Sequence, residues 1–182
     1  MRQQGFSLVE LLMGLMIVGI VLHLVTPAFA ALTESNHREV AAESLISGIR
    51  NARTLAISRN QSVVIHGING DWGQGWRIIV DVSGKGPDDS SNPIVIEHTS
   101  ETRVPIAGNW WVKRYIRFSS LGEPLMPKKA FQAGTLHLCD AHEPVSQLQV
   151  VLAATGRVSL RSDKAAQALC EKEVKSKQRT NA

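Results

Sequence analysis

The 182-residue chain lacks the sequence motifs of several large enzyme classes. It has no G-x-S-x-G motif, and its glycines show no phosphate-loop spacing. The glycine-rich stretch 67–75 also fails the G-x-G-x-x-G spacing of dinucleotide-binding proteins. We therefore expect no enzymatic activity, no catalytic residue and no cofactor.

Cysteine is equally scarce, with Cys139 and Cys170 both in the last third of the chain. In an exported protein such a pair indicates one disulfide, and in a cytosolic protein two thiols. His137, Cys139 and His142 are metal-ligand residue types, but three of them at the end of a predicted strand make a weak motif. We expect no metal site.

The N-terminus decides the compartment. A short polar leader, MRQQG, precedes an apolar run over residues 6–33. About 20 apolar residues suffice to cross a bilayer. The run can be interpreted as a secretory signal peptide, because Arg2 is basic and Ala28-Phe29-Ala30 matches an A-x-A cleavage site. A simple membrane anchor is a second interpretation.

Both interpretations must account for Glu10, a carboxylate inside the apolar run. A charged side chain there costs about 2.5–3.5 kcal/mol on insertion scales, and a cleaved signal has no use for it. Cleavage after Gly5 would create an amino group on Phe6, one helical turn before Glu10. That amine could pair with Glu10 of the same or a neighbouring subunit, which would set the register between stacked subunits.

The segment GFSLVELL (5–12) resembles the processing site of type IV pilins and pseudopilins. The resemblance implies that a prepilin peptidase cuts between Gly5 and Phe6 and methylates Phe6, and that Glu10 acts in assembly. It also implies a single pass through the inner membrane, a head in the periplasm, and later incorporation into a filament. The implied partners are other pilin subunits and the pilus assembly machinery.

Beyond residue 33 the chain becomes amphipathic. Apolar residues recur at three- and four-residue steps, at Ala41, Leu45, Ile49, Ala52 and Ala56. This pattern predicts a helix of about 53 residues in all, roughly 80 Å long. We expect a leader at 1–5, a transmembrane and assembly helix at 6–33, the amphipathic half of the same helix at 34–60, a head at 61–170 and a basic tail at 171–182.

Short β-branched runs follow the helix. Strands are predicted over 62–67, 76–82, 93–98, 112–118, 134–139, 147–153 and 157–161. A turn over 68–75 favours a hairpin, and 83–92 reads as a flexible loop. The predicted fold class is α+β, with the long N-terminal helix packed on a β-rich head of two sheets.

Three motifs of the head, DWGQGW (71–76), FSSLG (118–122) and GRVSLR (156–161), resemble the GspH/FimT branch of this family. Its members are minor pilins of type IV pili or minor pseudopilins of type II secretion. With the periplasmic destination this implies, Cys139 and Cys170 are expected to form a disulfide. Core packing is the expectation for all four tryptophans, with an inter-subunit contact as the alternative for Trp110 and Trp111.

The C-terminal segment 156–182 is basic. It carries seven lysines and arginines against three acidic residues, an excess of +4 that equals the formal charge of the whole chain. A strand over 157–161 would place Arg157 and Arg161 on one face, about 13 Å apart. In the GspH/FimT branch a Gly-Arg-x-Arg motif is associated with DNA capture in natural transformation; here Ser159 occupies the second arginine position.

The candidate DNA-binding residues are therefore Arg157, Arg161, Lys164 and Lys172, in a segment able to neutralise several phosphates. The opposing interpretation is a solvated tail. Together the features predict a minor type IV pilin that enters or primes a pilus, with DNA as a candidate partner. The alternative function is a minor pseudopilin of a type II secretion system.

Overall fold

The computed structural model describes residues 8–101, 104–127 and 129–171, apart from the side chains of residues 24, 27 and 28. The predicted leader and all but the first residue of the predicted tail lie outside the described residues. The chain divides into two compact units between His37 and Arg38.

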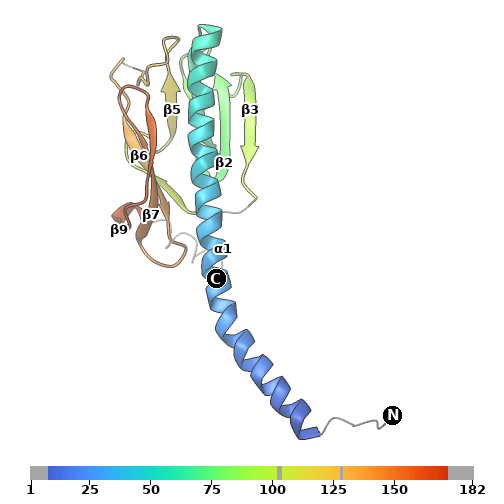
Figure 1. The fold of residues 1–182 in the computed structure, drawn as a ribbon. Coiled ribbons are helices and arrows are strands. Elements are labelled where there is room, and N and C mark those ends of the chain that lie inside the picture. The colour runs from blue at the N-terminus through green and yellow to red at the C-terminus, as the bar shows by residue number, and fades with distance from the viewer. Residues whose placement is uncertain (1–7, 102–103, 128, 172–182) are drawn as a thin grey trace. The chain divides into compact units, whose positions relative to one another are not determined.

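One long helix, α1, runs from Leu8 to Arg59 (Figure 1). The residue after the C-terminal end of α1, Asn60, adopts a left-handed conformation with φ 50°. The N–H of Asn60 donates to the Ile57 carbonyl, and that of Gln61 donates to the Ala56 carbonyl. This pair of bonds is a Schellman motif, and it satisfies carbonyls that the helix leaves unpaired.

The part of α1 in the second unit buries one face of small and aliphatic side chains. Five of them are at most 1% exposed: Ala42, Leu45, Ile49, Ala52 and Ala56. The predicted face is confirmed, except that Ala42 rather than Ala41 is fully buried. Gly48 lies on the same face, and a Cβ there would be 2.7 Å from the Trp76 ring. The helix therefore approaches the sheets closely.

The first sheet is antiparallel and contains β1 (Val63–Ile68), β2 (Asp71–Val80), β3 (Ile94–Thr99) and β5 (Tyr115–Phe118), in the order β3-β2-β1-β5. The β1–β2 hairpin turns at Asn69 and Gly70, which both have positive φ, as a tight hairpin turn requires. The predicted turn was too long, because residues 71–75 already belong to β2. The pairing of β1 with β2 continues past a bulge after Gly67, where the register shifts.

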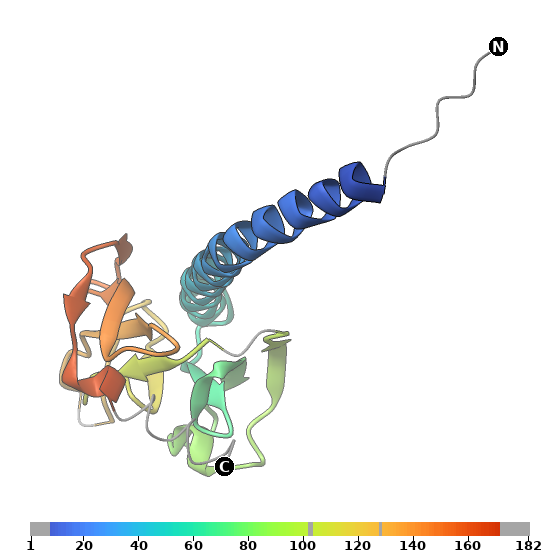
Figure 2. The ribbon, with the colours of Figure 1, turned by 90° about the horizontal axis from the view of Figure 1, so that it is seen from below.

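The second sheet contains β4 (Ile106–Gly108), β6 (Gly134–Cys139), β7 (Val145–Leu152), β8 (Val158–Arg161) and β9 (Ala165–Ala166). The order is β4-β6-β7-β8, and β9 also pairs with β7. Figure 2 shows the two sheets as separate groups of strands. The short strands β4 and β9 were not predicted, because two or three residues carry no periodic signal.

Both sheets and the second half of α1 share one hydrophobic core. It combines helix residues such as Leu45 and Ile49 with Ile65 and Phe118 of the first sheet and Leu136 of the second. The predicted fold class, a long N-terminal helix packed on a β head of two sheets, is confirmed.

The segment 83–92 is more than the flexible loop expected from its composition. It contains a short 3-10 helix, η1 (Gly86–Asp88), tied to the head by buried Asp81 and Asn92. Asp81 accepts from the Gly86 N–H at 2.8 Å, and the Asn92 amide donates to the Gly86 carbonyl at 2.9 Å. Arg117 lies 2.7 Å from the Asp81 carboxylate.

Two of the family-like motifs meet on α1. Gly122 ends FSSLG and Gly156 begins GRVSLR, and both have positive φ. A Cβ on Gly122 would be 2.6 Å from Ile57, and a Cβ on Gly156 would be 3.1 Å from the Gly122 carbonyl and 3.2 Å from the Arg53 guanidinium. Arg53 also donates to the Gly156 carbonyl at 3.3 Å. The two glycines let two loops close on one arginine.

We predict that Gly156→Ala destabilises the head more than Gly70→Ala does. Both residues have φ near +79°, so both alanines carry backbone strain of about 1–2 kcal/mol. A Cβ added to Gly70 would meet nothing within 4 Å, whereas Gly156 is enclosed. Urea unfolding of both variants measures the difference. An equal decrease in the free energy of unfolding for the two variants would show that the space around Gly156 is not restrictive.

Candidate functional site

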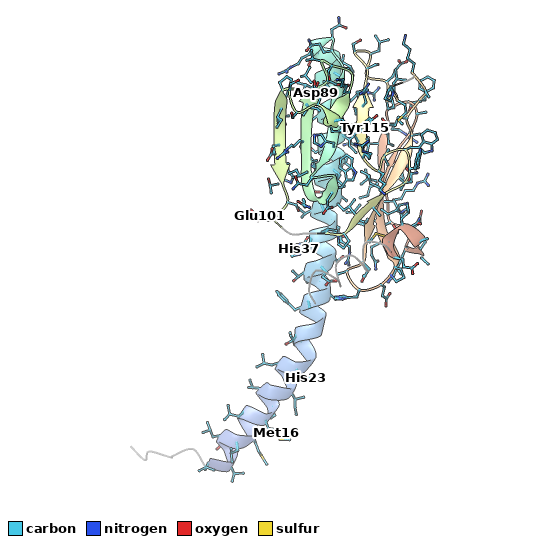
Figure 3. All side chains as sticks on the ribbon, turned by 180° about the vertical axis from the view of Figure 1, so that it is seen from behind. Met16, His23, His37, Asp89, Glu101 and Tyr115 are labelled. Carbon is cyan, nitrogen blue, oxygen red and sulfur yellow. A yellow bond between two sulfur atoms is a disulfide. The ribbon has the colours of Figure 1, made fainter. Side chains whose placement is uncertain are left out.

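The first half of α1 exposes an apolar surface. From Leu8 to Leu32, each large hydrophobic side chain that the structure describes is 50–73% exposed. Glu10 is exposed among them, whereas Gly5 and Phe6 lie outside the described residues. Figure 3 shows the side chains of Met16 and His23 projecting from this part of the helix. Within the described part of the chain, no helix meets the length and hydropathy of a membrane span.

Three of the four predicted DNA-binding residues are described, and all three are exposed: Arg157, Arg161 and Lys164. Arg157 directly precedes β8, Arg161 ends it, and Lys164 directly precedes β9. Because β8 and β9 both pair with β7 on the side away from β6, the three residues follow one edge of the second sheet. Lys172 lies outside the described residues.

The chain after β8 is fastened to the second sheet. Cys170 forms a disulfide with Cys139 at the end of β6, which is the pairing expected from the sequence. Both cysteines are fully buried. The Gln167 N–H donates to the Pro144 carbonyl at 2.9 Å, and β9 pairs with the start of β7. We call residues 162–170 the C-terminal clasp.

Two polar side chains of the sheet, Gln149 and His137, also hold the clasp, and the Ser146 hydroxyl links them. Gln149 donates to the Asp163 carbonyl at 2.6 Å and to the Ser146 hydroxyl at 2.9 Å. The Nδ1 atom of His137 lies 3.1 Å from the same hydroxyl, and its Nε2 atom lies 3.4 Å from the Gln167 amide nitrogen. Gln149 thereby fixes the backbone between Arg161 and Lys164. The sequence predictions missed this set, because isolated polar residues on strands form no motif.

The hydrogen bonds define the state of His137. The Leu169 N–H donates to the Gln167 side-chain oxygen at 3.3 Å, so the Gln167 amide nitrogen faces the imidazole. Nε2 of His137 must then accept, and Nδ1 donates to Ser146. This is the neutral ring. Burial lowers the pKa of His137, which agrees with that assignment.

The weak metal motif is not assembled. Cys139 is used in the disulfide, and His137 contacts Ser146 and Gln167. Over the described ranges, no three histidine, cysteine, aspartate or glutamate side chains are grouped so as to hold a metal ion.

The four tryptophans divide into two pairs. Trp72 and Trp76 are 3% and 6% exposed, as expected, and their indole N–H groups donate to the Lys113 carbonyl and the Ser44 hydroxyl, both at 3.0 Å. Core packing was the wrong expectation for the second pair. Trp110 is 83% exposed and Trp111 48%, because the turn between β4 and β5 directs both away from the core.

A long N-terminal helix packed on two antiparallel sheets, with an exposed apolar first half bearing one glutamate, is the architecture of a type IV pilin-like protein. Residues 41–156 match the family of the type II transport protein GspH, and residues 1–26 match the prokaryotic N-terminal methylation motif. The chain belongs to the GspH family, in the GspH/FimT branch of pilin-like proteins.

Solved structures show the same fold. Two crystal forms of the type IV minor pilin FimU of Pseudomonas aeruginosa align with TM-scores of 0.58 and 0.55, at 22% and 21% sequence identity. The alignments cover 75% and 71% of this chain and 98% of FimU in both cases. No curated protein matches the sequence significantly.

We predict that the head loses stability as the pH falls below about 6.5, the ordinary pKa of histidine. Burial lowers the folded-state pKa of His137 and of His66, so the unfolded chain binds protons first and acid favours unfolding. The melting temperature should fall between pH 7.5 and pH 5.5. His137→Gln should reduce that fall. An unchanged pH dependence in His137→Gln would contradict the neutral assignment.

Proposed function

We propose that this protein is a minor type IV pilin, anchored in the inner membrane by residues 6–33 and then assembled into, or priming, a pilus. The observation that carries the proposal is the row of exposed apolar side chains from Leu8 to Leu32, most of which lies within the match to the methylation motif over residues 1–26. Each such side chain gains about 1.5–3 kcal/mol when it leaves water, so the row needs a lipid or helix environment.

Glu10 would determine the axial position at which the apolar helices of neighbouring subunits pack. In lipid its charge needs a partner, and the processed amino group of Phe6 in an adjacent subunit supplies one. The pair would form at a single axial offset, because only one carboxylate occurs between Leu8 and Thr33. Glu10 would then align subunits, while the surrounding apolar side chains provide most of the association energy.

We predict that Glu10→Ala leaves membrane insertion intact but reduces the amount of the protein in filaments at least tenfold, roughly the effect of losing 1.4 kcal/mol. Sheared filaments and membranes are quantified by immunoblot, and mass spectrometry reads the mature N-terminus. Glu39→Ala, at an exposed glutamate beyond the apolar run, is the control. A mature chain beginning at Ala31, in place of methylated Phe6, would refute the pilin assignment.

The alternative is a minor pseudopilin of a type II secretion system. The description of the matching family as a type II transport protein supports it. Both functions would use the same N-terminal helix and the same processing. Deleting the gene separates them: loss of pili supports the first, and loss of protein secretion with normal pili supports the second.

A contribution to DNA binding is a second proposed activity. Arg157, Arg161 and Lys164 are exposed along one sheet edge, where Gln149 and the disulfide hold the backbone. Cations held in place can neutralise phosphates without first being ordered, and such binding is independent of base sequence and sensitive to salt. This arrangement would suit capture of DNA during natural transformation.

We predict that the head, residues 34–182, retards duplex DNA in a gel shift and that Arg157→Gln/Arg161→Gln weakens binding at least tenfold. Removing two phosphate contacts should also reduce the salt slope by about 1.8. The matched control is Arg50→Gln/Arg59→Gln, which removes the same charge from exposed sites on α1. Equal losses in both variants would indicate net charge alone, and negligible binding by the wild-type head would end the DNA proposal.

A further inference from the structure

The most exposed aromatic side chains of the described head lie on two neighbouring segments. Trp110 and Trp111 are 83% and 48% exposed, and Phe131 is 62% exposed. Large aromatic rings that gather on a surface are typical of interaction sites, whereas single exposed apolar side chains are not. We call Trp110, Trp111 and Phe131 the aromatic patch.

The turn that carries the two tryptophans is held firmly. The Asn109 N–H donates to the Thr135 carbonyl at 3.0 Å, and the Val112 N–H closes the turn onto the Asn109 carbonyl at 3.1 Å. Val112 itself is fully buried, and the buried Trp72 indole donates to the Lys113 carbonyl. The tryptophans are thus exposed on an anchored turn.

Gln132 connects this turn to the segment that bears Phe131. It is fully buried, and its amide nitrogen donates to the Trp111 carbonyl at 2.7 Å and to the Tyr115 carbonyl at 2.8 Å. Its oxygen accepts from the Arg117 N–H at 3.0 Å. Because the nitrogen and the oxygen of this buried amide both bond to backbone groups, Gln132 holds the two segments together. The backbone that carries the aromatic patch is therefore ordered before a partner binds.

The charges around the patch favour a protein over a nucleic acid. Arg114 is paired with Asp88, and Arg117 with Asp81, so two carboxylates already neutralise two of the nearby cations. The exposed Asp88 carboxylate lowers the positive potential that a phosphate backbone would need here, and the buried Arg117–Asp81 pair adds no net charge. Within the described residues, two exposed lysines flank the patch along the chain: Lys113 two residues after Trp111, and Lys129 two residues before Phe131.

Aromatic anchors with a basic rim define the chemistry of the partner. Tryptophan side chains bury about 150–250 Å² each and dominate binding when they enter an apolar pocket. Two tryptophans and a phenylalanine can supply the centre of an interface whose usual size is about 800 Å² per partner. Lys113 and Lys129 would then face acidic side chains at its rim.

We propose that the aromatic patch, with Lys113 and Lys129, is the surface by which this head docks onto the head of another pilin-like subunit, one that presents an apolar pocket with an acidic rim. The inference rests on the proposed function, because it takes assembly with other pilin-like subunits as given. It adds which face of the head makes the contact.

The test is photo-crosslinking in the full-length chain, expressed in the cells it comes from. A photoreactive amino acid at Trp110 should yield an adduct with a second protein that carries an N-terminal methylation motif, and the linked peptide should lie in the head of that protein. The same amino acid at Val82, a 74% exposed site, should not yield this adduct. Absence of the Trp110 adduct, linkage to nucleic acid, or an identical adduct from Val82 would overturn the proposal.

Trp110→Ala/Trp111→Ala provides the second readout. Because these side chains are exposed, the melting temperature should change by no more than about 2 °C. Filament-associated protein should fall at least tenfold relative to Val82→Ala. Wild-type incorporation of the double variant would refute the docking surface. The mature N-terminus, read from the same cells, separates this failure from that of the proposed function: methylated Phe6 with no effect of the tryptophan variant refutes the docking surface alone.

Discussion

The close approach of α1 to the two sheets is the contact on which the head depends. Ala42, Ala52 and Ala56 present almost no side chain beyond Cβ, and Gly48 presents none, so the helix lies against the Trp76 ring. Small residues bury little area themselves, but they let the larger side chains of both sheets reach the helix and each other. One hydrophobic core is therefore shared by the helix and both sheets, and the second half of α1 forms part of that core.

The head motifs that resemble the GspH/FimT branch serve this packing. Gly73 of DWGQGW passes so close to the Val104 carbonyl that no side chain fits, and Gly75 lies equally close to the His98 carbonyl. Gly122 and Gly156 close two loops on Arg53. These glycines are required by backbone approach and by positive φ. Motifs of this kind identify the fold and the family.

Buried polar side chains fix the conformation of loops and edges that strand pairing alone does not hold. Gln132 holds the tryptophan turn, Gln149 holds the basic edge, and Asn92 holds the loop after β2. Each is buried, and each uses its amide on backbone groups. A buried amide left without partners is costly, so these contacts stabilise one loop conformation over others. The surfaces proposed for assembly and for DNA both rest on such loops.

The amino-acid sequence by itself determined the long helix, its buried face, most strands of the two sheets and the pilin class. It did so because apolar periodicity and the Gly-Phe-Glu processing pattern are local signals that need no knowledge of the rest of the chain. The one disulfide also followed, once the compartment was inferred, from there being only two cysteines. Only the tertiary structure decided the exposure of Trp110, the hydrogen bonds that hold the 83–92 loop, and the short strands β4 and β9. It also decided the contacts between the C-terminal clasp and His137. Each of these arises from contacts between residues far apart in the chain, and no local pattern encodes which distant backbone group an isolated Gln, Asn or Trp will meet.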